Sequence, residues 1–446
     1  MIIFEIMRFL PFLLSILIWF QPKAQSNPAI TSWLQNTTET GNYYLSGNSM
    51  AIDNGILYNC QKIEYSENFV YVHTHGIPSY PTGPFQDGNP SQAENQNAIF
   101  QIPLNPTEET GNKQSTTAGN IGIFINGVAL FDYRDGVAWN PQTNALCGGP
   151  GNPRCPGDMD WNRDAVPAEM EGFDCSKGHP SKGNYHHHQN PTAFKLDKNV
   201  VSTICNLYDA DGLYAIDQTK HSPLIGFAYD GFPIYGAYGY KNTDGTGGIV
   251  RIKSSYELKN ITSRLNGPDV DNSYFLGYFK EDYQYVKHDE EDYLDEHNGR
   301  FCVTPEYSNG TYAYFATVDE NWNSVYPYAI GPTFYGQYQN RSVNSVDENT
   351  TVYEKSASID AKAKMEIQIF PNPSAELIAV QTKGLNLNTL SVHMLSINGE
   401  EVYKGQINSG QTLSYISTEA LYSGMYILVV RSNKDILLQE KVKVVR

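Results

Sequence analysis

Six of the ten histidines lie in three short stretches, and their spacing is typical of metal ligands. On a β-strand, residues i and i+2 point to the same face, about 6.5–7 Å apart along the chain. His186 and His188 are related in this way, as are His73 and His75, and His179 lies on a neighbouring loop with glycine and proline. Neutral imidazoles suit zinc or copper, whereas calcium sites use hard oxygen ligands. The sequence therefore predicts a copper or zinc site at His186 and His188 with His179 as a third ligand, and a second candidate site at His73 and His75.

A simpler interpretation leaves these histidines without a metal. In that case they hydrogen-bond to their neighbours on a tyrosine-rich surface, and an H-x-H pattern alone does not distinguish the two cases. The chain contains no G-x-S-x-G, H-E-x-x-H, P-loop or dinucleotide-binding motif. Standard hydrolase and nucleotide chemistry therefore has no support, no catalytic residue is assigned, and the question whether the chain is an enzyme stays open.

The composition favours a β-rich protein with more than one domain. The chain has 446 residues, against ~100–200 for a typical domain, and 40% of them are hydrophobic, which is enough for a packed core. The 32 tyrosines favour strands, while 37 glycines and 24 prolines favour turns, so we expect an all-β fold. The net charge of −17 argues against nucleic acid and anionic membrane as main partners, because both attract basic surfaces.

The N-terminal sequence predicts export. Residues 9–20 form an apolar run that follows Arg8 and precedes a polar stretch. This run is too short for the ~20 residues that span a bilayer, but it matches the core of a signal peptide. We therefore expect a signal peptide over residues 1–25, cleaved near Ala24 or Gln25, and a mature chain without a stable transmembrane segment. An uncleaved membrane anchor is the alternative.

The six cysteines are even in number and include no C-x-x-C pair. In an exported protein this pattern favours disulfides over zinc or thioredoxin chemistry. The sequence does not determine the pairing, with one exception. Cys147 and Cys155 flank a loop rich in glycine and proline that can close on itself, so we expect them to pair.

The central region shows the same pattern of elements twice. Residues 121–132 and 225–236 each contain a strand, an Asn-Gly or Asp-Gly turn and a second strand, which is a hairpin pattern. Each hairpin is followed by a loop that begins with glycine and by a tyrosine-rich strand, at residues 185–188 and 312–315. We therefore expect a large duplicated β-rich domain over residues 26–340, with chance recurrence of hairpin residues as the alternative. Because only the first half carries histidines in its last strand, we expect the functional site there.

The composition changes after residue 340. Residues 341–364 are polar and lack periodicity, which predicts a linker. Strand patterns follow, with an Asn398-Gly399 hairpin turn between two of them. They predict a small immunoglobulin-like β-sandwich over residues 365–446.

Three motifs in this tail resemble the C-terminal sorting domain of the type IX secretion system of Bacteroidetes. They are IFPNPS at residues 369–374, the NG turn followed by VY at 402–403, and LYSGMY at 421–426. The resemblance covers residues 365–446. It implies export to the periplasm, passage across the outer membrane by the type IX machinery, and removal of the tail. An ordinary immunoglobulin-like binding module is the alternative.

Three longer motifs in the central region resemble the YHYH protein family. They are GHPSKGNYHHH at 178–188, SPLIGFAYDGFPIYG at 222–236 and TPEYSNGTYAY at 304–314. The similarity covers about residues 44–336 and brings no established reaction with it. The Tyr-His-Tyr-His string of the family is Tyr-His-His-His here, so His187 stands in place of the second tyrosine. His297 stands where the family pattern has a cysteine, and Cys302 lies close enough to replace that cysteine in a disulfide.

These features predict a protein that is secreted or attached to the outer cell surface and carries a histidine-lined copper or zinc site. Its role is then metal capture or redox chemistry, with Tyr185 near the metal, and the type IX secretion machinery is a partner. The alternative is a non-enzymatic module that binds a glycan or surface polymer, such as a cell-surface polysaccharide, on exposed tyrosines and tryptophans.

Overall fold

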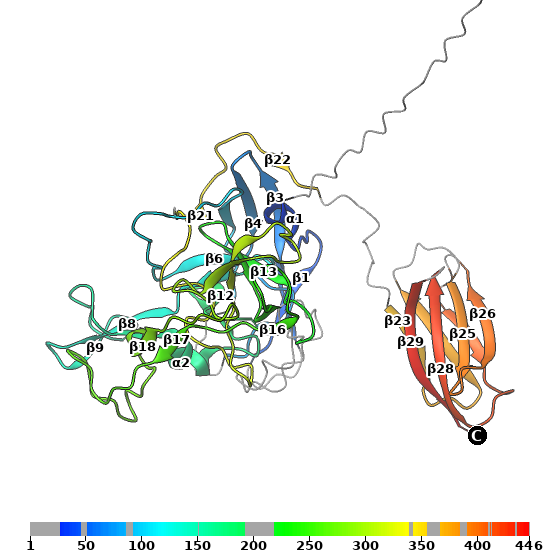
Figure 1. Cartoon of the computed structure of the whole chain (residues 1–446). Helices are drawn as coiled ribbons and strands as arrows, with labels where there is room; N and C mark the ends of the chain where they lie inside the picture. The colour runs from blue at the N-terminus through cyan, green and yellow to red at the C-terminus, as the bar shows by residue number, and fades with distance from the viewer. Residues whose placement is uncertain are drawn as a thin grey trace, which may run out of the picture. The chain divides into compact units, whose positions relative to one another are not determined.

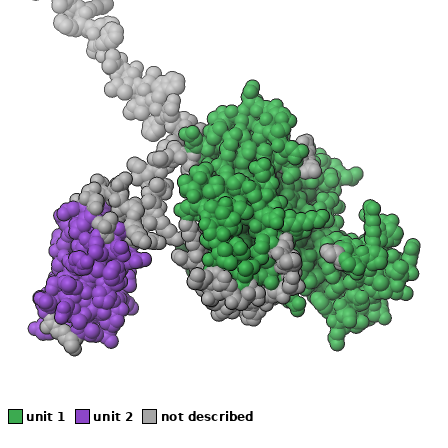
Figure 2. Space-filling view, turned by 180° about the vertical axis from the view of Figure 1, so that it is seen from behind, with its two compact units in different colours: residues 1–354 green, residues 355–446 purple. Residues whose placement is uncertain are grey.

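The computed structural model divides the chain into two compact units, residues 1–354 and 355–446 (Figures 1 and 2). None of the helices in the described part of the chain is long and apolar enough to cross a membrane. The predicted signal peptide over residues 1–25 lies outside the described residues. The structure describes residues 27–45, 51–85, 92–149, 151–191, 218–338, 342–354, 366–383, 390–408, 411, 413–432 and 435–445.

The centre of the large unit is an eight-stranded sheet built from two matching chain segments. Its strand order is β11-β12-β7-β6-β13-β14-β20-β19. The first four in chain order are β6 (Asn120–Phe124), β7 (Ala129–Phe131), β11 (Gly178–Ser181) and β12 (Asn184–His187). The second four are β13 (Leu224–Ala228), β14 (Pro233–Tyr235), β19 (Gly299–Cys302) and β20 (Thr311–Phe315). Each half has an antiparallel hairpin, a parallel pairing of its second and fourth strands, and an antiparallel hairpin at the sheet edge.

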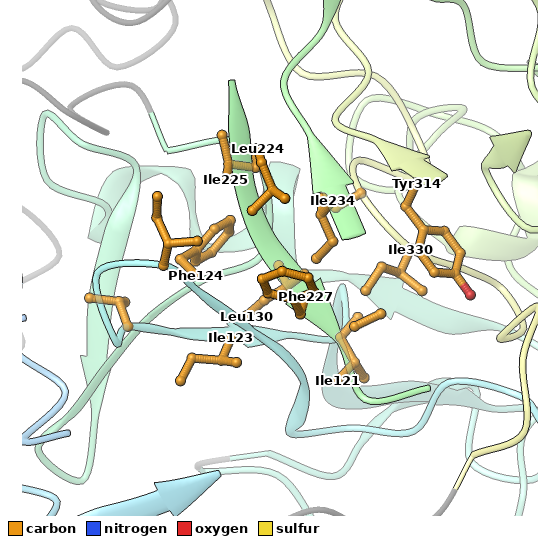
Figure 3. Packing of buried hydrophobic residues seen from close by; sticks show 14 of the residues in the cluster. Ile121, Ile123, Phe124, Leu130, Leu224, Ile225, Phe227, Ile234, Tyr314 and Ile330 are labelled. Atoms are coloured by element: carbon orange, nitrogen blue, oxygen red, sulfur yellow. The ribbon is translucent and has the colours of Figure 1, made fainter. Parts of the chain in front are cut away.

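The two halves meet at the antiparallel pair β6–β13, in the centre of the hydrophobic core (Figure 3). Ile123 lies opposite Phe227, and both side chains are fully buried. The glycine on each strand allows this close approach. A Cβ atom on Gly122 would lie 2.8 Å from the carbonyl oxygen of Phe227, and one on Gly226 would lie 2.6 Å from that of Ile123. The predicted duplication is therefore a pseudo-twofold arrangement about this strand pair.

Each half also fixes its edge hairpin with the same aspartate–tyrosine pair. Tyr185 donates its hydroxyl hydrogen to Asp174 at 2.8 Å, and Tyr312 donates to Asp295 at 2.9 Å. The other carboxylate oxygen of Asp174 accepts from the backbone N–H groups two and four residues further on, and Oδ1 of Asp295 does the same in the second half. The chain turn before the hairpin is therefore the same in both halves.

A five-stranded sheet packs against this core, with Ile63, Val72 and Phe100 buried in the common cluster. Its order is β21-β5-β4-β3-β22. The strands are β3 (Cys60–Tyr65), β4 (Phe69–Thr74), β5 (Ala98–Pro103), β21 (Ser342–Val343) and β22 (Thr351–Val352). Residues 342–354 thus contribute two short strands to the large unit, where the sequence predicted the start of a linker.

Smaller elements complete the large unit. The three-stranded sheet β10-β8-β9 lies beside the pair β17–β18 (Figure 1), and a bridge links Arg163 of β10 to Phe279, which precedes β18. The strands are β1 (Thr40–Tyr43), β2 (Ile52–Leu57), β8 (Arg134–Asn140), β9 (Ala145–Cys147), β10 (Asn162–Asp164), β15 (Tyr238–Tyr240), β16 (Ile249–Arg251), β17 (Tyr256–Leu258) and β18 (Tyr283–Tyr285). The helical segments are α1 (Pro28–Thr31), α2 (Ala165–Glu169), η1 (Met170–Gly172) and η3 (Lys280–Asp282).

The small unit consists of two antiparallel sheets with their own core. One sheet has the order β23-β24-β27, formed by β23 (Glu366–Phe370), β24 (Leu377–Lys383) and β27 (Leu413–Ser417). The other has the order β26-β25-β28-β29, formed by β25 (Leu390–Ser396), β26 (Glu401–Ile407), β28 (Gly424–Ser432) and β29 (Asp435–Val444). Val380, Met394 and Leu428 are fully buried between them. The prediction of an all-β fold, with a duplicated large domain and a small β-sandwich, is confirmed.

The cysteines agree with the sequence prediction only in part. Cys147 and Cys155 form the expected disulfide, and Cys175 is also disulfide-bonded. Cys205 lies outside the described residues. Cys60 and Cys302 are free thiols with 0% and 1% of their surface exposed, so neither fulfils the expectation of a disulfide, and Cys302 does not replace the missing family cysteine. Both are packed in the common core, where a thiol behaves as a small hydrophobic side chain.

Candidate metal site

Three of the predicted ligands come together on one face of the edge hairpin β11–β12. His179 on β11 lies directly opposite His186 on β12, and His188 follows two residues later on the same face. One ligand nitrogen of each imidazole lies within 4.8 Å of the other two. Within the described part of the chain, no other group of three or more histidine, cysteine or acidic side chains is as close. All three histidines are buried, so they do not belong to a tyrosine-rich surface.

The hydrogen bonds of two of these rings determine which nitrogen is free. Nδ1 of His186 lies 2.8 Å from the carbonyl oxygen of Asn184, and Nδ1 of His188 lies 2.6 Å from that of Asp132. A carbonyl oxygen can only accept a hydrogen bond, so both Nδ1 atoms carry the hydrogen. In the neutral rings, both Nε2 atoms then present lone pairs, and these two atoms are 3.2 Å apart. Two facing lone pairs need a proton or a metal ion between them.

A carboxylate that the sequence did not indicate completes the group. Oε2 of Glu169, the last residue of α2, lies 3.3 Å from Nε2 of His179 and 3.3 Å from Nε2 of His188. Oε2 of Glu169 and Nε2 of His179 are both buried, and they contact each other without the geometry of a hydrogen bond. Buried polar atoms in native proteins nearly always make well-formed hydrogen bonds, so this contact is an unusual arrangement that an ion between the atoms would satisfy.

The helix that carries Glu169 is held in place from its N-terminus. Asp164 caps α2 by accepting a hydrogen bond from the backbone of Val166 at 2.9 Å, and it also accepts the hydroxyl hydrogen of Tyr328 at 2.6 Å. The N-terminus of the short helix is therefore fixed, and this places Glu169, at the C-terminal end of the helix, next to the histidines.

Burial and charge set the protonation states of the group. Burial lowers the pKa of His186 well below its usual value, and the neighbouring His188 and His179 lower it further. Burial acts in the same direction on His188, but the Glu169 carboxylate outweighs it and raises the pKa of His188. Burial would raise the pKa of Glu169, but hydrogen bonding to His179 and His188 lowers it below its usual value. The carboxylate is therefore ionised and His186 is neutral, which are the forms that bind metals.

Three of the distances among the four side chains can be compared with those around a tetrahedral ion. Ligand atoms 2.0–2.1 Å from a tetrahedral zinc ion lie about 3.3 Å from one another. The contacts of 3.2 Å between His186 and His188, and of 3.3 Å from Glu169 to His179 and to His188, agree with this value, although Glu169 is not part of the group whose atoms all lie within 4.8 Å of one another. Three imidazoles and one carboxylate are also a donor set that zinc and copper accept.

Aromatic rings and a cavity surround the group. Phe131 stacks on His186 with ring centres 3.8 Å apart, and Phe173 meets His179 edge-on at 4.9 Å. The three imidazoles line a cavity of about 700 Å³, which is larger than a hydrated ion. The rings are therefore held rigidly on one side and accessible on the other.

The remaining sequence-predicted ligands lie elsewhere. His73 is on β4 in the five-stranded sheet, and its Nε2 atom lies 2.6 Å from Oε1 of Glu64. His75 follows the end of β4, and its backbone N–H donates to Gln61 at 2.8 Å. Neither joins the triad, and no third ligand completes a group with them in the described ranges. A metal at His73 and His75 stays a prediction.

Comparison with known families identifies the large unit. The model of the YHYH protein family matches residues 99–326, just over half of the chain. The chain belongs to the YHYH family. A secretion-system C-terminal sorting domain matches residues 368–445, so the chain carries the tail of type IX export and is secreted or attached to the outer surface. No curated protein matches the chain.

The structure also explains the altered YHYH string. His187 points away from the triad, is fully buried, and lies 2.7 Å from the hydroxyl of Tyr80. Burial lowers its pKa to about 3, so the ring is neutral. The strand pairing places Tyr314 at the corresponding position of the second half, where it donates to Asp230 at 2.6 Å. In the YHYH domain the second tyrosine position is therefore a core position, and His187 fills it with another hydrogen-bonding ring.

Proposed function

We propose that the YHYH domain binds one zinc or copper ion through Nε2 of His179, His186 and His188, with Oε2 of Glu169 as the fourth ligand. The observation that carries this proposal is the 3.2 Å contact between two Nε2 atoms whose rings both carry their hydrogen on Nδ1. The buried Oε2 atom of Glu169 adds an anionic ligand at the same point. A metal ion satisfies all four atoms at once.

The ligand set favours metal capture over catalysis. Four protein ligands complete a tetrahedral shell, whereas catalytic zinc sites keep one position open for water or substrate. Hydrogen bonds to the backbone and contacts with aromatic rings hold the three imidazoles in their orientation without the ion. Little conformational entropy is therefore lost when the ion binds. The metal therefore serves as bound cargo or as a structural centre of an exported protein.

The route to the surface is part of the same proposal. The sorting tail requires the chain to reach the periplasm first, and the apolar run at residues 9–20 has the character of a signal peptide for that step. We infer a Bacteroidetes origin from the same tail. At the cell surface, the site is then exposed to external zinc and copper.

The test is metal content. The full secreted chain, loaded with zinc or copper and freed of excess ion, should retain about one ion per chain by mass spectrometry. The double variant His186→Ala/His188→Ala should lose it, because only one imidazole and one carboxylate remain. The matched control is His73→Ala/His75→Ala, which removes two histidines with the same spacing and should keep the ion. Substoichiometric metal in the parent protein after loading with each ion would contradict the proposal.

A further inference from the structure

A second cavity lies where the second half of the duplicated sheet meets residues 27–29 and 104–108. Its volume is about 640 Å³, within the ~300–1,000 Å³ typical of small-molecule sites. It shares no lining residue with the cavity of the histidine triad. Its aromatic lining residues are Phe232, Phe301, Tyr307, Tyr312 and Tyr335. The proposed metal site therefore does not account for it.

Phe301 forms an exposed aromatic platform at the rim of this cavity. It lies on the edge strand β19 with 63% of its surface exposed, opposite the buried Tyr312. One side of the ring rests on the turn at Gly310, where a Cβ atom would lie 2.9 Å from the ring. Tyr335 stacks on Tyr312 behind it, with ring centres 3.6 Å apart. The ring of Phe301 is therefore packed against the neighbouring chain on one side and open to solvent on the other.

The duplicated fold does not require an aromatic residue at this position. The strand pairing makes Pro180 the counterpart of Phe301 in the first half, and Pro180 is buried. An exposed phenylalanine adds nothing to the core and leaves a large apolar surface in water. A single exposed apolar side chain is common, but this one lies at the mouth of a cavity, where its ring is available to contact a ligand.

The polar groups of the cavity favour an uncharged ligand. None of the described residues that line it is lysine, arginine or histidine, which disfavours an anion. Its two carboxylates are already engaged, since Glu108 contacts Lys113 at 3.3 Å and Glu306 accepts the hydroxyl hydrogen of Tyr235 at 2.9 Å. Asn105 and Asn309 are exposed at the same cavity, and among the described residues their side chains have no hydrogen-bond partner.

We propose that this cavity binds an uncharged oligosaccharide. A sugar ring has an apolar C–H face that packs on the exposed face of Phe301. Its hydroxyl groups both donate and accept hydrogen bonds, and the side-chain amides of Asn105 and Asn309 offer both functions in turn. Surface export places the cavity where glycan chains are accessible. This site is independent of the metal site.

The test uses the full secreted chain and calorimetric titration with linear hexasaccharides of glucose, xylose, mannose and N-acetylglucosamine. At least one should bind with a Kd below about 1 mM. Phe301→Ala should weaken binding at least about tenfold, whereas Phe301→Tyr, which keeps the ring, should stay within about threefold. Because the ring is exposed, Phe301→Ala should unfold at nearly the parental temperature, which separates lost binding from lost folding.

The matched control is Phe275→Ala, which removes a phenylalanine that is 43% exposed and does not line the cavity. It should leave binding unchanged. Tetralysine and oligogalacturonate are titrated as charged ligands for comparison. The proposal is overturned if none of the four hexasaccharides binds with a Kd below about 1 mM, or if both alanine variants weaken binding equally. It is also overturned if only tetralysine or oligogalacturonate binds. The last outcome would assign the cavity to a charged ligand.

Discussion

The two edge hairpins of the YHYH domain have the same backbone arrangement but carry different side chains at the positions of the three histidines. Both are fixed by an aspartate–tyrosine pair and begin with the same turn. At the positions of His179, His186 and His188, however, the second half has Arg300, Ala313 and Phe315. The histidines are therefore not needed to form the hairpin. They are an addition to a structure that the second half builds without them.

The second half also shows what fills the same place in the absence of ligands. The guanidinium group of Arg300 lies over the ring of Phe315, 5.3 Å from its centre. It donates hydrogen bonds to the backbone carbonyl oxygens of Tyr240, Lys241 and Glu291. This half thus contains a permanent side-chain cation with carbonyl partners, whereas the first half presents nitrogen lone pairs and a carboxylate. The comparison favours an exchangeable cation in the first half.

The largest expected effect is on the free energy of unfolding, and it compares alanine variants at the equivalent positions Phe315 and His188. Phe315 is fully buried, so Phe315→Ala should lower the free energy of unfolding by about 3–5 kcal/mol through the lost burial and the cavity left behind. His188→Ala removes a polar ring with one backbone hydrogen bond and a contact to Glu169, and it should cost the metal-free protein less, about 1–3 kcal/mol. Denaturant unfolding of both metal-free variants measures the difference. If His188→Ala costs as much as Phe315→Ala, His188 is a core residue and the contrast between the halves fails.

The second prediction concerns the aspartate–tyrosine pair that both halves share, and the pH dependence of stability that it causes. Burial raises the pKa of Asp174 and of Asp295 to about 6, above the unfolded value of 3.8. A raised pKa means that folding favours the protonated form, so this contribution is present below about pH 4 and is lost as the pH rises through about 6. Each aspartate should therefore account for about 3 kcal/mol of the decline in unfolding free energy over this range.

Asp295→Asn and Asp174→Asn remove the titration while keeping an oxygen that accepts the backbone hydrogen bonds. Urea unfolding at about pH 4 and pH 7 should show a smaller decline with pH in each variant than in the parent. The two variants should behave alike, because the turns are alike. A decline that disappears in only one of them would show that the two pairs have different roles.

The sequence predicted the parts of this structure that depend on short-range patterns. The Asn-Gly and Asp-Gly turns predicted the hairpins, and the i, i+2 spacing predicted that His186 and His188 lie on one face. His179 was expected on a loop, but it lies on strand β11 opposite His186, because residues 178–181 pair with β12. Glu169 could not be found in this way, because it comes from a separate five-residue helix that meets the histidines only through tertiary packing. Strands β21 and β22 were missed for a related reason. Each has two residues and no periodicity of its own, and each forms by adding to an existing edge of the sheet formed by β3, β4 and β5.

The smallest effect sharpens the idea of an exchangeable cation. Glu169 raises the pKa of His188, so a proton shared with this pair is the natural occupant of the metal-free site at low pH. Metal must displace that proton, and its apparent affinity should rise about tenfold per pH unit until His188 is neutral in the metal-free protein, then level off. Glu169→Gln removes the carboxylate, so it should weaken binding and move the levelling point to lower pH.

Zinc titrations against a competing chelator between about pH 6 and pH 8, with proton release followed in two buffers, measure both quantities. Affinity that is independent of pH over this range would show that no proton competes for the site. Arg300, whose guanidinium stays charged at all these values, cannot make such an exchange. The pH dependence therefore separates a hairpin that can release its cation and bind a metal from one whose cation is fixed.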